Sequence, residues 1–216
     1  LCCGATILIY HTEKQKTLSF MGQCFFVLSM AFGVMAFLKF YIAAIVIAFL
    51  LFVIIESIRW KHFSVFPIQF FSAKYAISEK FHHAALLCLS IGLLFSIAAI
   101  INEEFVTFVN LEMVQLNTFF LGFSFPISLI TMSVMFSFMQ QRKTDKPNLA
   151  GQYSFWAINM GVIVFFIFIL FDLALPQVFI SSALFFSVIL IFVLFYKQAH
   201  KKQQKSFLSS GMFFLM

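Results

Sequence analysis

The residues best suited to chemistry are Glu56 and Arg59, which lie three positions apart near one end of an apolar run. Residues at i and i+3 share a helix face, so the carboxylate and the guanidinium can pair. An ionisable group inside a bilayer is costly and is therefore a candidate for function. Two roles follow: a structural ion pair whose long side chains reach toward the interface, or a relay for protons or cations. We favour the structural pair.

Four further residues are candidate metal or haem ligands: His62, His82, His83 and Glu79. Residues 79–82 form one Glu-x-x-His motif, whereas carboxylate-bridged di-iron sites use two such motifs with two further Glu. A haem held by two histidines needs facing imidazoles at membrane depth, and no His lies in the apolar middle of a run. We therefore predict no metal site, no bound cofactor and no catalytic residue. Haem at the membrane surface is kept as an alternative.

Polar side chains also follow one face of the run Leu116 to Met139. Ser124, Ser128 and Thr131 are spaced at i, i+4 and i+7, with Pro126 between them. Such a seam can line a transport pathway, because proline frees a carbonyl and hydroxyls offer oxygen ligands. It can equally pack helices together. In the next run, Asn159 is expected to make an interhelical hydrogen bond rather than to bind a ligand.

Sequence motifs typical of soluble enzymes are absent. Cys2, Cys3, Cys24 and Cys88 have no Cys-x-x-Cys spacing and are predicted to be free thiols. There is no phosphate-binding glycine loop and no Gly-x-Ser-x-Gly. The sequence therefore favours a protein that is not an enzyme.

Six apolar runs must position these candidates, and each approaches the ~20 residues that cross a ~30 Å hydrocarbon core as a helix. They are Leu18 to Leu38, Tyr41 to Ile58, Ala84 to Ile101, Leu116 to Met139, Tyr153 to Leu173 and Val178 to Tyr196. Only 10% of the residues are charged and 62% are hydrophobic. The runs lack the two-residue alternation of membrane strands, so they are predicted to be helices. The fold class is an all-α, polytopic integral membrane bundle.

The basic residues predict how the bundle is oriented. If the runs alternate in direction, thirteen of the fourteen Lys and Arg residues lie on one side and Lys39 alone on the other. By the positive-inside rule, the basic loops and the basic C-terminal tail face the cytoplasm or matrix of a bacterial or organelle inner membrane. A charge divided in this way fits a lipid bilayer and gives no support for nucleic-acid binding. Very short loops at Lys39 and Phe40 and at 174–177 predict two tight helical hairpins.

Two segments outside the runs carry further expectations. Residues 66–81 place Phe66, Phe70, Ile77 and Phe81 on one helical face, which predicts an amphipathic helix in the headgroup plane. Residues 1–10 form an apolar stretch half long enough to span, which we interpret as part of an earlier helix. We expect one membrane domain over residues 1–216, within a longer chain.

One window, Tyr153 to Gly161, resembles a known family. It contains Phe155, Trp156, Asn159 and Gly161 in the order Phe-Trp-x-x-Asn-x-Gly, similar to the start of one span in haem-copper oxidase catalytic subunits and their nitric-oxide-linked relatives. The resemblance covers about 50 residues, and it would imply a redox membrane subunit. The family's paired histidines would fall at 114–117, where this chain has none, so the redox centre is not carried over.

The sequence thus leads to three hypotheses. The first is a non-catalytic, multi-pass subunit of a larger membrane complex, with lipid and other membrane subunits as partners. The second is a transporter or channel subunit that uses Glu56 and the polar seam. The third is a redox membrane subunit distantly similar to the haem-copper oxidase subunits.

Overall fold

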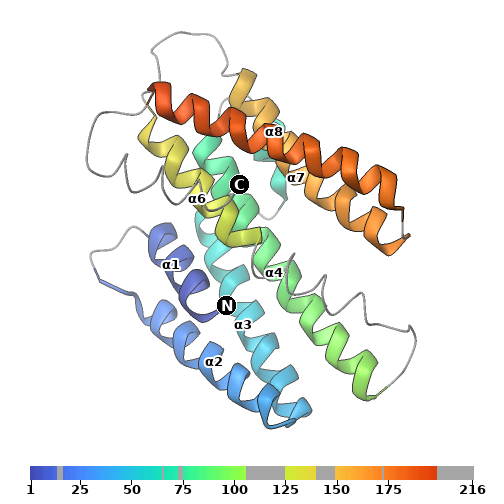
Figure 1. Cartoon of the computed structure of the whole chain (residues 1–216). Coiled ribbons are helices and arrows are strands. Elements are labelled where there is room, and N and C mark those ends of the chain that lie inside the picture. Colours follow the sequence, from blue (N-terminus) through green and yellow to red (C-terminus); the bar gives the residue numbers. More distant parts are fainter. Residues whose placement is uncertain are drawn as a thin grey trace. The chain divides into compact units, whose positions relative to one another are not determined.

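The computed structural model describes residues 1–13, 17–64, 66–72, 75–105, 125–139, 149–171 and 173–198. Over these ranges the chain forms seven α-helices and one short 3₁₀ helix (Figure 1). They are α1 (Cys2–Glu13), α2 (Phe20–Phe37), α3 (Tyr41–His62), η1 (Pro67–Phe70), α4 (Ile77–Glu104), α6 (Phe125–Phe138), α7 (Leu149–Leu170) and α8 (Ala174–Gln198).

Five of the described helices are long and apolar enough to cross a membrane: α2, α3, α4, α7 and α8. The predicted class, a helical membrane protein, is therefore confirmed. The expected run 116–139 is described only as α6, a 14-residue helix that begins at Phe125. Positions 116–124 lie outside the described residues, so the count of six spans stays a prediction.

Several helices begin or end beyond the apolar runs that predicted them. Helix α3 continues past Ile58 to His62, and α4 begins at Ile77, before the predicted start at Ala84. Charged side chains are compatible with both extensions, because cations are favourable in a last turn and anions in a first turn. Arg59 and Lys61 lie in the last turn of α3, and Glu79 lies in the first turn of α4.

The predicted amphipathic helix over 66–81 is not one element in the structure. Pro67 begins a single 3₁₀ turn that ends at Phe70, and residues from Ile77 onward belong to α4. The reason is visible in the packing of Phe81, which is fully buried and stacks on Phe136 at 5.5 Å. Tertiary packing therefore joins the second half of the segment to a long helix instead of leaving it on the surface.

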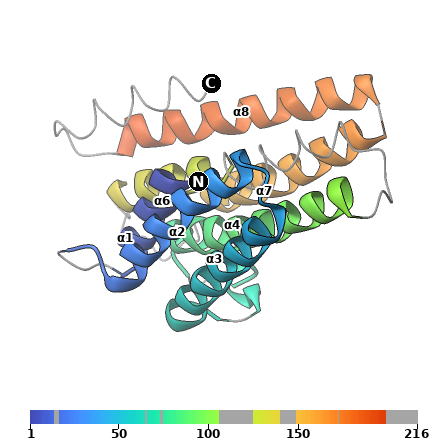
Figure 2. The same cartoon turned by 90° about the horizontal axis from the view of Figure 1, so that it is seen from below.

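The chain divides into two compact units. The first unit comprises Leu1–Phe71 and His82–Ile130, and the second comprises Ser72–Phe81 and Thr131–Met216. In the first unit α1, α2 and α3 pack against one another, and α2 lies beside α3 (Figure 2). Ala44, Ala48, Leu51 and Ile55 form a fully buried stripe on α3. The small Ala44 and Ala48 side chains allow the close approach that lipid-embedded helices need.

The hairpin between α2 and α3 closes through a Schellman motif. Lys39 adopts φ 62°, the left-handed conformation. Its N–H donates to the Ala36 carbonyl at 3.2 Å, and the Phe40 N–H donates to the Met35 carbonyl at 3.0 Å. These bonds satisfy carbonyls at the end of α2, where glycine is the usual residue at the left-handed position. The predicted tight turn at Lys39 and Phe40 is confirmed.

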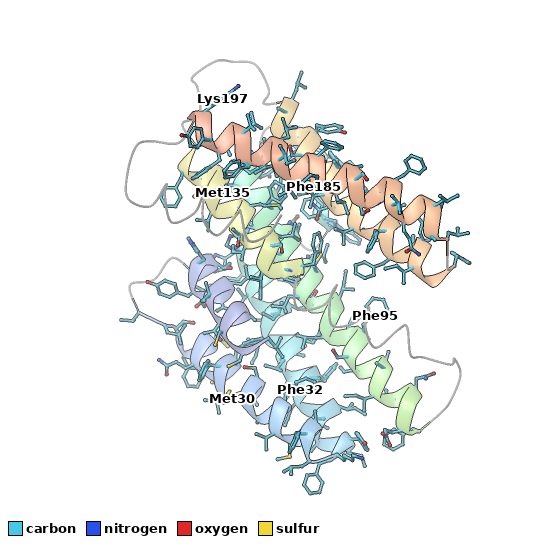
Figure 3. The ribbon with its side chains drawn as sticks, viewed as in Figure 1. Met30, Phe32, Phe95, Met135, Phe185 and Lys197 are labelled. Atoms are coloured by element: carbon cyan, nitrogen blue, oxygen red, sulfur yellow. The ribbon has the colours of Figure 1, made fainter. Side chains whose placement is uncertain are left out.

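The second unit is built around the hairpin of α7 and α8. Gly161 lies against Leu184, and a Cβ added at Gly161 would come within 2.7 Å of the Leu184 Cδ2 atom. The Gln177 side chain closes the turn by donating to the Phe168 carbonyl at 3.1 Å. Large apolar side chains are exposed on the helices of both units, for example Met30 on α2 and Phe185 on α8 (Figure 3). Such surfaces are suited to a lipid bilayer.

Candidate functional site

A buried ion pair on α3 is the centre of the candidate site. The Arg59 Nη2 and Glu56 Oε2 atoms are 2.6 Å apart. Arg59 Nε also donates to Oε1 at 3.1 Å and to Oε2 at 3.0 Å. Arg59 is 5% exposed and Glu56 is 9% exposed. The expected i, i+3 pair is therefore present, and it is buried within the protein rather than reaching out as a loose surface pair.

The same guanidinium links α3 to two other segments. Arg59 Nη1 donates to the Ser64 carbonyl at 3.3 Å, and it lies 3.3 Å from the His83 Nε2 atom on α4. These contacts are possible because α3 ends at His62 and Phe63 is extended, with φ −133° and ψ 176°. One side chain thus joins the end of α3, the following loop and the beginning of α4.

The contact with Arg59 determines the protonation of the His83 ring. A guanidinium has only donors, so His83 Nε2 must accept, and Nδ1 carries the proton of the neutral ring. Nδ1 is buried, and among the described residues no group pairs with it. The ring stacks on Phe63 at 4.8 Å with an interplanar angle of 11°, and meets the edge of Phe70 at 5.0 Å. His83 therefore accepts a hydrogen bond from Arg59, and its ring packs against two aromatic rings.

The neighbouring histidine faces a different helix. His82 Nε2 lies 2.7 Å from the Thr12 Oγ1 atom on α1, and that hydroxyl donates to the Leu8 carbonyl at 2.7 Å. With its proton directed to Leu8, the Thr12 hydroxyl oxygen can accept from a protonated His82 Nε2. The ring of His11 lies 6.4 Å from that of His82. The adjacent histidines therefore tie α4 to two helices, His83 to α3 and His82 to α1.

The candidate metal ligands do not converge. His62 is exposed at the end of α3, and Glu79 is exposed in the first turn of α4. Within the described ranges, no three His, Cys, Asp or Glu side chains lie together in a group that could hold a metal ion. Of the Glu-x-x-His motif, Glu79 is exposed, whereas His82 contacts Thr12 on α1.

The polar seam is only partly described. Ser128 and Thr131 lie on α6 and are half-buried, whereas Ser124 lies outside the described residues. An interhelical bond was expected for Asn159; among the described residues its Nδ2 donates at 2.8 Å to the Phe155 carbonyl of the same helix. An asparagine can satisfy its amide on its own helix four residues back, and this competes with a bond to a neighbouring helix.

Two polar contacts in the second unit were missed by the sequence. Lys80 is 1% exposed, and its Nζ lies 3.3 Å from the Gln152 Oε1 atom. The Ser133 hydroxyl donates to the Ser78 carbonyl at 2.7 Å. The burial of Lys80 could have been predicted from the sequence. It shares the helical spacing 77, 80, 81, 84 with three buried apolar residues. A lysine inside an apolar stripe indicates a buried partner, which composition alone does not identify.

The arrangement of Glu56, Arg59, His82 and His83 is suited to holding helices in place. Both carboxylate oxygens accept from Arg59, and each histidine is fixed by a partner on another helix. Comparison with protein-family models, curated proteins and solved structures finds no match for this chain.

Proposed function

We propose that this chain is a non-catalytic, multi-pass subunit of a larger membrane protein complex. The main support is the pairing of Glu56. Both of its carboxylate oxygens accept hydrogen bonds from Arg59. A relay for protons or cations needs a carboxylate that can exchange partners as its cargo moves. A carboxylate held by a bidentate guanidinium is better suited to a structural role.

The exposed surface is compatible with this role. Ile42 on α3 and Phe179 and Phe186 on α8 are exposed by 70%, 74% and 66%, respectively. Lipid can cover such side chains, and so can the apolar spans of neighbouring subunits, which pack by shape in a bilayer. We place the chain in a bacterial or organelle inner membrane, with its basic loops on the cytoplasmic or matrix side.

The experiment is purification of the tagged chain from its native membrane in a mild detergent, followed by native mass measurement. We expect a species of fixed stoichiometry heavier than the 24.8 kDa chain. A reciprocal tag on the co-purifying protein should recover this chain in the same ratio. A monomer that alone drives ion flux in reconstituted vesicles would contradict the proposal.

The same preparation separates the other two hypotheses. Ion flux that is lost in Glu56→Gln, with folding unchanged, would assign the chain to the transporters. A Soret absorption band that is lost in His82→Ala or His83→Ala would assign it to the redox subunits. We expect neither flux nor a Soret band from the isolated chain.

A further inference from the structure

The segment that follows α3 has two distinct faces. On one face, Phe63 and Phe70 lie against the buried His83 ring at 4.8 and 5.0 Å. On the other, Phe66 is 73% exposed and Ile68 is 70% exposed, on either side of Pro67. The η1 turn therefore presents large apolar side chains outward while its inner face is fixed to the protein.

The depth of this turn follows from its contacts. Phe70 packs on His83, and His83 contacts Arg59, which lies three residues before the end of α3. These contacts, with the Arg59 hydrogen bond to the Ser64 carbonyl, tie η1 to the last turn of the α3 span. Trp60, in that last turn, is 57% exposed, and Lys61 beside it is also exposed. Exposed Trp beside Lys is typical of the boundary between headgroups and acyl chains.

Several backbone polar groups of the turn also have hydrogen-bond partners within the protein, as a site with little water requires. The Ile68 N–H donates to the Phe66 carbonyl at 2.8 Å, and the Phe71 N–H donates to the Ile68 carbonyl at 3.1 Å. The Ser64 hydroxyl also donates to the Phe66 carbonyl, while Arg59 donates to the Ser64 carbonyl. Irregular backbone is tolerated near lipid when its polar groups have internal partners of this kind.

We propose that Phe66 and Ile68 insert into the headgroup–acyl boundary of a phospholipid leaflet, so that η1 is an interfacial anchor. Arg59 and His83 hold the anchor from the protein side. The inference rests on the spanning character of α3 and not on the subunit role, so either can fail without the other.

The test is fluorescence quenching of a single tryptophan in vesicles. Trp60→Phe and Trp156→Phe remove the two native tryptophans, and Ile68→Trp then reports on the anchor in phosphatidylcholine vesicles. We expect brominated phosphatidylcholine to quench this tryptophan at least two-fold, and aqueous iodide to leave it nearly unchanged. Phe70→Trp in the same background is the matched control, because it faces His83 and should be quenched less by brominated lipid.

Two results would overturn the proposal. Strong quenching by iodide would place Ile68 in water, and quenching by neither agent would place it against protein. Phe66→Trp repeats the measurement on the same face if the Ile68 variant does not fold, as judged by circular dichroism and gel filtration.

Discussion

The two compact units join their helices by different means. In the first unit, α3 meets α4 through the Arg59–Glu56 ion pair and His83, all of them buried. In the second, apolar contacts stand beside the Lys80–Gln152 and Ser133–Ser78 hydrogen bonds. The ring of Phe81 lies 5.5 Å from Phe136 and 5.2 Å from Phe155, and Gly161 lies against Leu184. A polar network depends on every member keeping its partner, whereas an apolar contact weakens in proportion to the atoms removed. The Arg59 network should therefore be more sensitive to single substitutions than the Phe81 contact.

The strongest test of this contrast is Arg59→Ala. Removal of the guanidinium leaves the Glu56 carboxylate buried without its partner, which typically costs about 3–5 kcal/mol. We expect a loss of this size in unfolding by sodium dodecyl sulfate from dodecyl maltoside micelles. Lys61→Ala is the control, because this exposed lysine lies in the same turn of α3 and should change stability by less than about 0.5 kcal/mol.

The corresponding substitution in the second unit is Phe81→Ala. It removes a fully buried ring that contacts Phe136 and Phe155. We expect a loss of about 2 kcal/mol, below the usual value for a water-soluble core, because part of the driving force vanishes in lipid. Phe179→Ala, at a position 74% exposed, should have little effect in the same unfolding assay. If Phe81→Ala lowered the unfolding free energy by more than Arg59→Ala, this difference between the two sites would be refuted.

A smaller effect separates two glycines. A Cβ at Gly161 would lie 2.7 Å from Leu184, whereas one at Gly33 would meet nothing within 4 Å. Both changes to alanine gain helix propensity, but only Gly161→Ala forces a neighbour to move. We expect Gly161→Ala to be less stable than Gly33→Ala by about 1 kcal/mol. In a Leu184→Ala background this penalty of Gly161→Ala should disappear. Equal stabilities for the two glycine variants would show that the α7–α8 contact is loose.

The smallest predicted effect concerns the turn between α2 and α3. Lys39 holds a left-handed conformation that costs a non-glycine residue about 1 kcal/mol or more. Lys39→Gly should relieve this strain and stabilise the protein by about 0.5 kcal/mol, since glycine also gains freedom in the unfolded chain. Lys39→Ala, which keeps the strain, is the control. Equal thermal stability of the two variants would contradict this view of the turn.

The helical membrane class was predicted from the long apolar runs. In lipid, the backbone N–H and C=O groups of such runs can form hydrogen bonds only with other backbone groups. The sequence also predicted the Glu56–Arg59 pair, since i, i+3 spacing is a local property of one helix. Helix ends were less accurate, because α3 and α4 continue through charged residues that composition treats as loop. Local hydropathy predicts where lipid ends and does not predict where a helix ends.

The contacts that His83 and His82 make with other helices could not be predicted from local sequence spacing. His83 is 24 residues from Arg59, and Thr12 is 70 residues from His82, so both contacts depend on how the helices pack. For Asn159 a long-range bond was expected, and its amide nitrogen donates to the nearer Phe155 carbonyl of its own helix. Pairings across helices need tertiary information that a single sequence does not contain.

If Glu56 and Arg59 act as one structural unit, their contributions to stability are coupled, and a double-mutant cycle measures that coupling. The cycle compares the unfolding free energies of Glu56→Gln, Arg59→Gln and the double variant with that of the native chain. We predict a coupling energy of about 2 kcal/mol or more, because the double variant leaves no unpaired charge. A coupling near zero, with both single variants as stable as the native chain, would contradict the account.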